Sequence, residues 1–220
     1  LSNALRAALA YRILNNDSHD FNNDSNILLQ AFQSHLNTLN DMSRYHIDWV
    51  QDNLLNPAAL EEIIHPHEII GLLDESNLLS SYPSFFESWE WYKSLHSENT
   101  NISNKWINQF NKKSHNFLDS KIISTELLDT SNIKLEHLSR EISERIIKIR
   151  RHDMPDETLI NLVNKLIDYI PHSHAPIVIS IKEWLKCYKE DKITIELISN
   201  LNTFKNWFGR ELIYMSFTKN

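Results

Sequence analysis

This sequence of 220 residues predicts an all-α fold, an irregular bundle of about eight to ten helices with no substantial sheet. The first observation is the presence of only two glycines, Gly71 and Gly209, where an average composition of roughly 7% would give about fifteen. Hairpins, phosphate loops and dinucleotide-binding turns use glycine for positive φ angles or close backbone approach. The second observation is that apolar residues recur at spacings of three and four along most of the chain.

The predicted helices of the first half share apolar stripes and are separated by Asn, Pro or other polar residues. They span residues 3–15, 26–55 as one long or kinked helix, 57–65, 67–74, 81–96 and 102–118. A polar loop from Asn15 to Asn26 contains the pair Asp24-Ser25, which predicts an N-cap for the second helix. Pro66 is expected to interrupt the helix that Pro57 begins.

The predicted helices of the second half include the clearest pattern in the chain. They span residues 132–151, 155–170, 177–189, 191–202 and 203–217. In the first of these, Leu135, Leu138 and Ile142 continue a 3-4 rhythm, and Glu residues precede Arg or Lys by four positions. The windows 176–181 and 192–198 alternate enough to be strands, but each runs into a helical stripe, so helices are favoured.

A chain of 25.9 kDa is long enough for one well-filled core. We therefore expect one helical domain over residues 1–220. A division into two subdomains, 1–119 and 131–220, is the alternative, because the connector 119–131 carries the weakest pattern.

Composition narrows the classes of function. The net charge of −7 argues against general nucleic-acid binding, which needs an excess of Lys and Arg. Cys187 is the single cysteine, so an intramolecular disulfide and a cysteine-rich metal site are excluded, and a buried structural thiol is expected. We find no apolar run of the roughly 18–20 residues that span a bilayer and no signal peptide, and a soluble cytoplasmic protein is expected.

An aromatic run over residues 82–92 is the first candidate binding surface. One helix face accommodates Phe85 and Trp89, but Trp91 points elsewhere. Because aromatic residues dominate the energetics of interfaces, Trp91 and Phe86 are candidate partner-binding residues. The alternative for Trp91 is a second contact with the core.

Basic residues at the end of the 132–151 helix form the second candidate surface. Arg145, Lys148 and Arg151 are able to contact an acidic peptide, a phosphate or an anionic lipid head group. The alternative is a solvated helix end whose positive charges complement the helix dipole.

Four histidines in two His-x-His elements beside prolines are candidate metal ligands. They are His65, His67, His172 and His174. Glu62 precedes His65 by three residues, as in di-iron bundles, but such sites need this motif twice and the chain has it once. The favoured interpretation is therefore no metal and no cofactor.

Signatures of common catalytic sites are absent, since Walker, Rossmann and nucleophile-elbow motifs need glycines that the chain lacks. The sequence therefore favours a non-catalytic protein–protein interaction module, such as an adaptor, a scaffold or a regulatory subunit, whose partner is another protein. A helical metal-dependent enzyme that uses His, Glu and Asp residues in 62–75 and 152–174 is the alternative. Nucleic-acid binding through residues 140–152 is less favoured.

Overall fold

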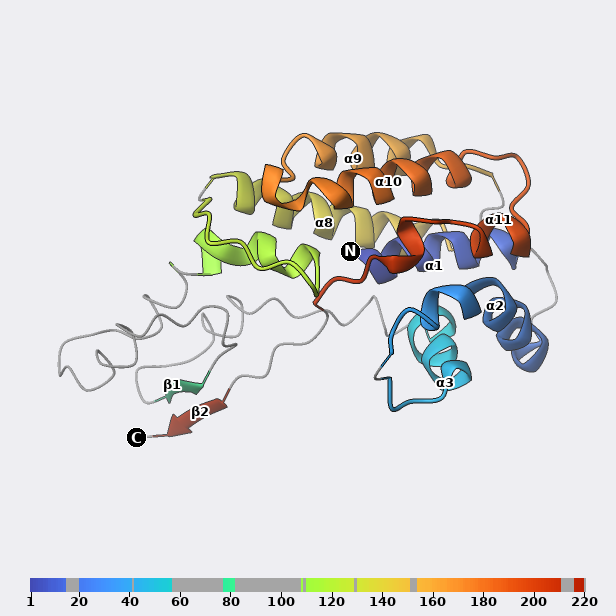
Figure 1. Cartoon of the computed structure of the whole chain (residues 1–220), viewed down its shortest axis with the longest axis horizontal. Coiled ribbons are helices and arrows are strands. Elements are labelled where there is room, and N and C mark those ends of the chain that lie inside the picture. The colour runs from blue at the N-terminus through green and yellow to red at the C-terminus, as the bar shows by residue number, and fades with distance from the viewer. Residues whose placement is uncertain are drawn as a thin grey trace.

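The computed structural model describes residues 1–14, 20–40, 42–56, 77–81, 108, 110–128, 130–150, 154–210 and 216–219. Over these ranges the chain is all-α, as the sequence predicts (Figure 1). The strands described, β1 (Asn77–Ser81) and β2 (Ser216–Lys219), form one short antiparallel ribbon in which Asn77 lies opposite Lys219. Within the same ranges, no helix combines the length and the apolar character that a membrane crossing requires.

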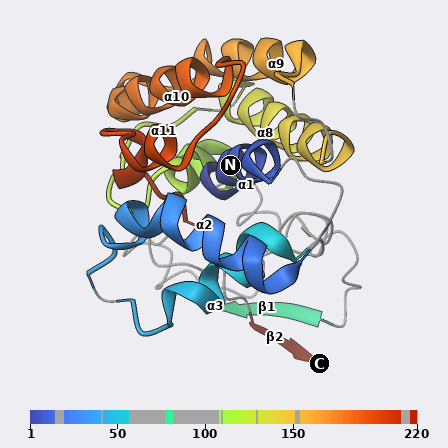
Figure 2. The same ribbon diagram turned by 90° about the vertical axis from the view of Figure 1, so that its right-hand side faces the viewer.

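Helix α1 (Ser2–Ile13) lies at the centre of the helical assembly (Figure 2). Every residue from Ala4 to Ala10 is buried. Because four of these seven residues are alanines, neighbouring elements can approach α1 closely from several sides, as a helix without a polar face requires. One such contact is a 2.9 Å hydrogen bond from the Trp184 indole Nε1 to the Leu5 carbonyl.

Helix α2 (Phe21–Leu36) begins earlier than the sequence predicts. Its N-cap is Asp20, whose Oδ1 accepts hydrogen bonds from the backbone N–H groups of Asn22 (3.0 Å) and Asn23 (3.4 Å). The predicted cap, Asp24-Ser25, instead lies buried within the first turns of the helix. The prediction was wrong because Asp20 caps equally well in chemical terms, and the tertiary packing of the following turns decides between the two.

The predicted long helix over 26–55 is interrupted rather than continuous. Helix α3 (His46–Val50) follows a non-helical stretch and passes directly into a π-helical turn, η1 (Gln51–Leu55). The break lets α3 and η1 fold back, so that α3 packs against α2 and η1 packs against α1. The predicted helices at 57–65 and 67–74, and nearly all of 81–96, lie outside the described residues.

The helices predicted between residues 102 and 202 form largely where expected. Residues 110–113 are helical and continue into η3 (Ser114–Leu118), followed by α8 (Thr130–Lys148) and α9 (Glu157–Ile167). The remaining elements are η4 (His172–His174), α10 (Ala175–Tyr188) and α11 (Ile195–Ser199). The window 176–181 is thus helical, because α10 buries Ile177, Ile181 and Trp184 at helical spacing.

The predicted helix over 203–217 is wrong for the residues described. Only the short turn η5 (Phe204–Asn206) is helical, and 207–210 is irregular before β2. The carboxylate of Glu183 accepts hydrogen bonds from the backbone N–H groups of residues 202, 203 and 204 at 2.6–2.8 Å. The guanidinium of Arg6 donates to the carbonyls of Phe204 (3.2 Å) and Trp207 (2.8 Å) and so ties this segment to α1.

One hydrophobic cluster includes residues from every described α-helix. It extends from Ala4 of α1 to Phe208 near the end of the chain. Side chains from residues on both sides of the 119–131 connector, such as Leu36 and Ile146, belong to this one core.

Candidate functional site

The connector between η3 and α8 is an extended segment that we call the strap, residues 119–128. In Figure 1 it runs as a green trace between η3 and the start of α8. Two of its large apolar side chains are exposed, Ile123 at 61% and Leu127 at 58%. Ile133, just inside α8, is exposed at 43%. Three of the large apolar side chains that the structure leaves exposed thus fall within residues 123–133.

The Asn116 side chain and two backbone hydrogen bonds, rather than a sheet, hold the strap in its path. Asn116 is fully buried, and its amide both accepts from the Ser124 N–H (2.6 Å) and donates to the Ser124 carbonyl (3.2 Å). At the two ends of the strap, the Ser120 N–H donates to the Phe208 carbonyl (2.8 Å), and the Leu128 N–H donates to the Lys112 carbonyl (2.9 Å). The strap is therefore fixed at its start, middle and end.

The segment 207–210 fixes η3 from the other side. The Trp207 indole donates to the Leu118 carbonyl (2.6 Å), and Arg210 donates from its backbone N–H to the Phe117 carbonyl (3.0 Å). Between them, a Cβ atom on Gly209 would lie 2.9 Å from the Phe117 carbonyl oxygen. Gly209 is thus required by close backbone approach, and its φ angle is not positive.

Two buried histidines lie beneath the strap. His115 comes from η3 and His174 from η4, and they are exposed at 1% and 0%. Their ring centroids are 5.4 Å apart and their planes are nearly perpendicular. For both imidazoles the Nε2 atom is buried without a hydrogen-bond partner among the described residues.

The hydrogen bonds around His115 define its tautomer. Both hydrogens of the Asn132 amide are used, by the carbonyls of Asn111 (2.8 Å) and Leu128 (2.6 Å). The Asn132 Oδ1 therefore faces His115 Nδ1 at 3.2 Å, and that nitrogen must be the donor. His115 Nε2 consequently carries a bare lone pair.

We assign the same tautomer to His174. The Ser173 hydroxyl has one hydrogen and two acceptors within reach, Glu126 Oε2 (3.4 Å) and His174 Nδ1 (3.0 Å). The assignment gives this hydrogen to the carboxylate, so that His174 Nδ1 donates to the hydroxyl. Burial lowers the pKa of both histidines, and His115 lowers that of His174 further, against the opposing charges of Asp119 and Glu126. Both rings are therefore neutral at pH 7.

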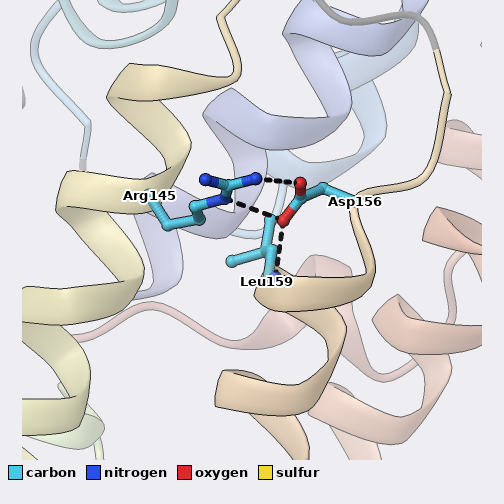
Figure 3. A network of polar contacts seen from close by, with 3 residues as sticks. All are labelled: Arg145, Asp156 and Leu159. Atoms are coloured by element: carbon cyan, nitrogen blue, oxygen red, sulfur yellow. Dashed lines mark hydrogen bonds and ion pairs between the residues drawn. The ribbon is translucent and has the colours of Figure 1, made fainter.

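The structure gives Arg145, a candidate partner-binding residue, a contact within the chain. Its Nε donates to Asp156 Oδ1 at 2.9 Å and its Nη2 contacts Asp156 Oδ2 (Figure 3). The same carboxylate caps α9 by accepting from the Leu159 N–H at 2.7 Å. This contact raises the pKa of Arg145 and ties the end of α8 to the start of α9.

The other sequence candidates are only partly described. Lys148 is exposed near the end of α8. Trp91, Phe86 and Arg151 lie outside the described residues. Their assignment to partner binding remains a prediction.

Of the two His-x-His elements, the structure describes only the one at 172–174. His65 and His67 lie outside the described residues, while His172 is exposed and His174 is buried against His115. Among the residues with described positions, no group of three or more His, Cys, Asp or Glu side chains is arranged to hold a metal ion. Cys187 is buried, and burial raises its pKa to about 11, as expected for a structural thiol.

Sequence reasoning missed His115 and the strap as features of interest. The 119–131 connector carries no helical periodicity, and this weakness was the only signal of an extended segment. No protein-family model, curated protein or solved structure matches the chain.

Proposed function

We propose that this chain is a protein-binding module and that the strap is its docking edge for an apolar segment of another protein. The observation that carries the proposal is the exposure of Ile123 and Leu127 on a backbone that is already held in place. A rigid edge loses little conformational entropy when a partner binds, so its apolar side chains contribute more of their burial energy to affinity.

Several charged groups are used inside the fold. Arg145 pairs with Asp156, and Glu183 accepts hydrogen bonds from the backbone of residues 202–204. Arg6 and Arg12 are buried and donate to backbone carbonyls. These side chains stabilise the fold and are engaged within the chain.

A matched pair of isoleucines tests the proposal. Ile123 on the strap and Ile179 on the outer face of α10 are exposed at 61% and 59%. A photo-crosslinking amino acid at position 123 or 127 is expected to capture a defined protein in cells of the native source, whereas the same group at position 179 captures none. Purified partner is then expected to bind the wild type but not Ile123→Asp or Leu127→Asp.

Ile179→Asp provides the control for these substitutions. It adds the same charge at an equally exposed isoleucine, so it should leave both binding and the melting temperature unchanged. Binding that survives Ile123→Asp with Leu127→Asp, or that is lost equally with Ile179→Asp, contradicts the proposal. Sedimentation of the purified wild type tests one further outcome. If the wild type self-associates and Ile123→Asp abolishes this association, the strap binds a second copy of this chain and not another protein.

A further inference from the structure

We propose that His115 and His174 form a proton-operated latch that keeps the strap closed at neutral pH and releases it on acidification. The latch lies beneath the docking edge, but its operation requires no partner and does not depend on the proposed function.

Geometry is the first support for a latch. The two rings meet at a centroid distance of 5.4 Å, and both are buried. The hydrogen bonds of Asn132 fix the proton of His115 on Nδ1, and the same tautomer is assigned to His174, so each Nε2 presents a lone pair with no donor among the described residues. A proton from solvent would add to this nitrogen. Each ring is therefore able to accept a proton at Nε2, and neither Nε2 has a hydrogen-bond partner among the described residues.

Connectivity to the strap is the second support. His115 binds Asn132, whose amide donates to the carbonyl of Leu128 at the end of the strap. His174 binds Ser173, whose hydroxyl donates to Glu126 in the strap. Each imidazole is thus one side chain away from the strap, and a movement of either ring is transmitted to it.

The charged groups that face the pair do not neutralise two added protons. Asp119 and Glu126 of the strap stabilise positive charge on His174, whereas Arg210 from the C-terminal segment and His115 itself oppose it. His115 is stabilised by Glu126 and by its bond to Asn132. Asn132 of α8 and Ser173 of η4 are neutral. If both rings were protonated, two imidazolium ions and one guanidinium would face only two carboxylates, which leaves an excess of positive charge.

Protonation therefore opens the strap. Each Nε2 gains a proton from water and becomes a buried donor, and the two cations then face one another across the ring contact. When the strap opens, water reaches both nitrogens, and the free-energy cost of holding two buried cations close together is removed. Because burial lowers the pKa of both rings, the opening begins below their ordinary value of 6.5 and not at neutral pH.

Hydrogen–deuterium exchange of the full chain tests the latch. After correction for the intrinsic pH dependence of exchange, the opening equilibrium of residues 119–128 should increase by roughly tenfold or more between about pH 7.5 and pH 5. Helix α10 should stay more protected than the strap at both pH values. The region of α2 and α11 around His35 should lose some protection as well, because the pKa of His35 rises from about 3 toward 6.5 when this region unfolds. The pH dependence that belongs to the latch is therefore the part that the double asparagine variant removes.

Asparagine at the two histidine positions provides the matched variant. The amide of His115→Asn or His174→Asn can replace the Nδ1–H donor, but it does not titrate. In the double variant, protection of the strap should be independent of pH. Should this variant fail to fold, histidine NMR of the wild type reports the Nε2 protonation and the tautomer of each ring directly.

Several results would overturn the latch. Unchanged protection of the strap on acidification is one, and an equal change in the double asparagine variant is another. Strap amides whose opening free energy equals that of α2 and α10 would show global unfolding instead. An Nε2–H tautomer, or a pKa near 6.5 for both rings, would remove the physical basis of the inference.

Discussion

The guanidinium carbon of Arg6 lies 3.8 Å from the centroid of the Phe208 ring, in the interior of the protein. The same group donates hydrogen bonds to the carbonyls of Ser2, Phe204 and Trp207. Arg6 therefore links the central helix to the irregular segment that follows α11.

Replacement of Arg6 by Met should destabilise the protein by about 3 kcal/mol, because buried carbonyls of η5 and its flank lose their donors. Arg6→Lys should restore only part of the lost stability, since an ammonium group lacks the planar arrangement of N–H donors and the flat face that stacks on an aromatic ring. Urea denaturation measures both. Lys182→Met, at an exposed position on α10, should change the free energy of unfolding by less than about 0.5 kcal/mol. Equal stability of Arg6→Met and wild type would contradict this role.

Asp156 performs two tasks that substitution can separate. Asp156→Asn keeps an acceptor for the Leu159 N–H but loses the ion pair with Arg145, which is partly exposed, so a cost below about 1 kcal/mol is expected. Asp156→Ala loses the cap as well and should cost about 1–2 kcal/mol more. Thermal melting of the two variants and of Arg145→Ala checks the order. An asparagine variant less stable than the alanine variant would be inconsistent with this account.

His35 should make the stability of the protein fall at acid pH. It is fully buried and contacts the Ile198 carbonyl through Nε2 at 2.9 Å, and burial and then Arg6 lower its pKa from 6.5 to about 3. As the pH falls, His35 is therefore protonated in the unfolded chain before it is protonated in the folded protein. The stabilisation of the fold by neutral His35 is complete above pH 6.5 and is lost as the pH falls toward about 3. The shift corresponds to about 4–5 kcal/mol.

Denaturation at a series of pH values measures this loss. His35→Gln can keep the donor to Ile198 without titrating, so its stability should depend less on pH than that of the wild type. An identical pH dependence in both proteins would show that His35 does not contribute.

Gly209→Ala should destabilise the protein although Gly209 adopts no positive φ angle. The new methyl group would lie 2.9 Å from the Phe117 carbonyl oxygen, and backbone atoms on both sides must then move. A cost of about 1–3 kcal/mol is expected. Hydrogen exchange at Arg210, whose N–H donates to Phe117, should rise in parallel. A fully stable variant with unchanged exchange would mean that η3 shifts freely.

The sequence was most informative where local pattern and tertiary packing agree. The stripe of Leu135, Leu138 and Ile142 predicts α8 and is buried as expected. Pro155 and Pro171 bracket α9 correctly, because proline is incompatible with a helix interior. Local pattern was insufficient where distant groups supply the hydrogen bonds. Glu183 and Arg6 form hydrogen bonds with backbone groups in and around η5. Both residues lie outside 203–217, so no pattern within that segment predicts these hydrogen bonds.

The candidate site could be predicted only in part. His174 was recognised as chemically interesting, but as a metal ligand with His172, whereas its structural neighbour is His115 from a distant part of the chain. A ring contact between 3-10 turns leaves no periodic signature in sequence. The strap escaped prediction for a related reason, since its extended path is maintained by Asn116 and Asn132 rather than by alternating apolar residues.

The central position of α1 has a consequence for biosynthesis. Its buried contacts include Trp184, Phe204 and Trp207, which a ribosome adds long after α1 has emerged. Until then, an alanine- and leucine-rich helix with two arginines lacks the groups that cover it, and such distant contacts slow folding. The nascent chain therefore lacks the groups that cover α1 until residue 207 has left the ribosome, and only then can this part of the core close.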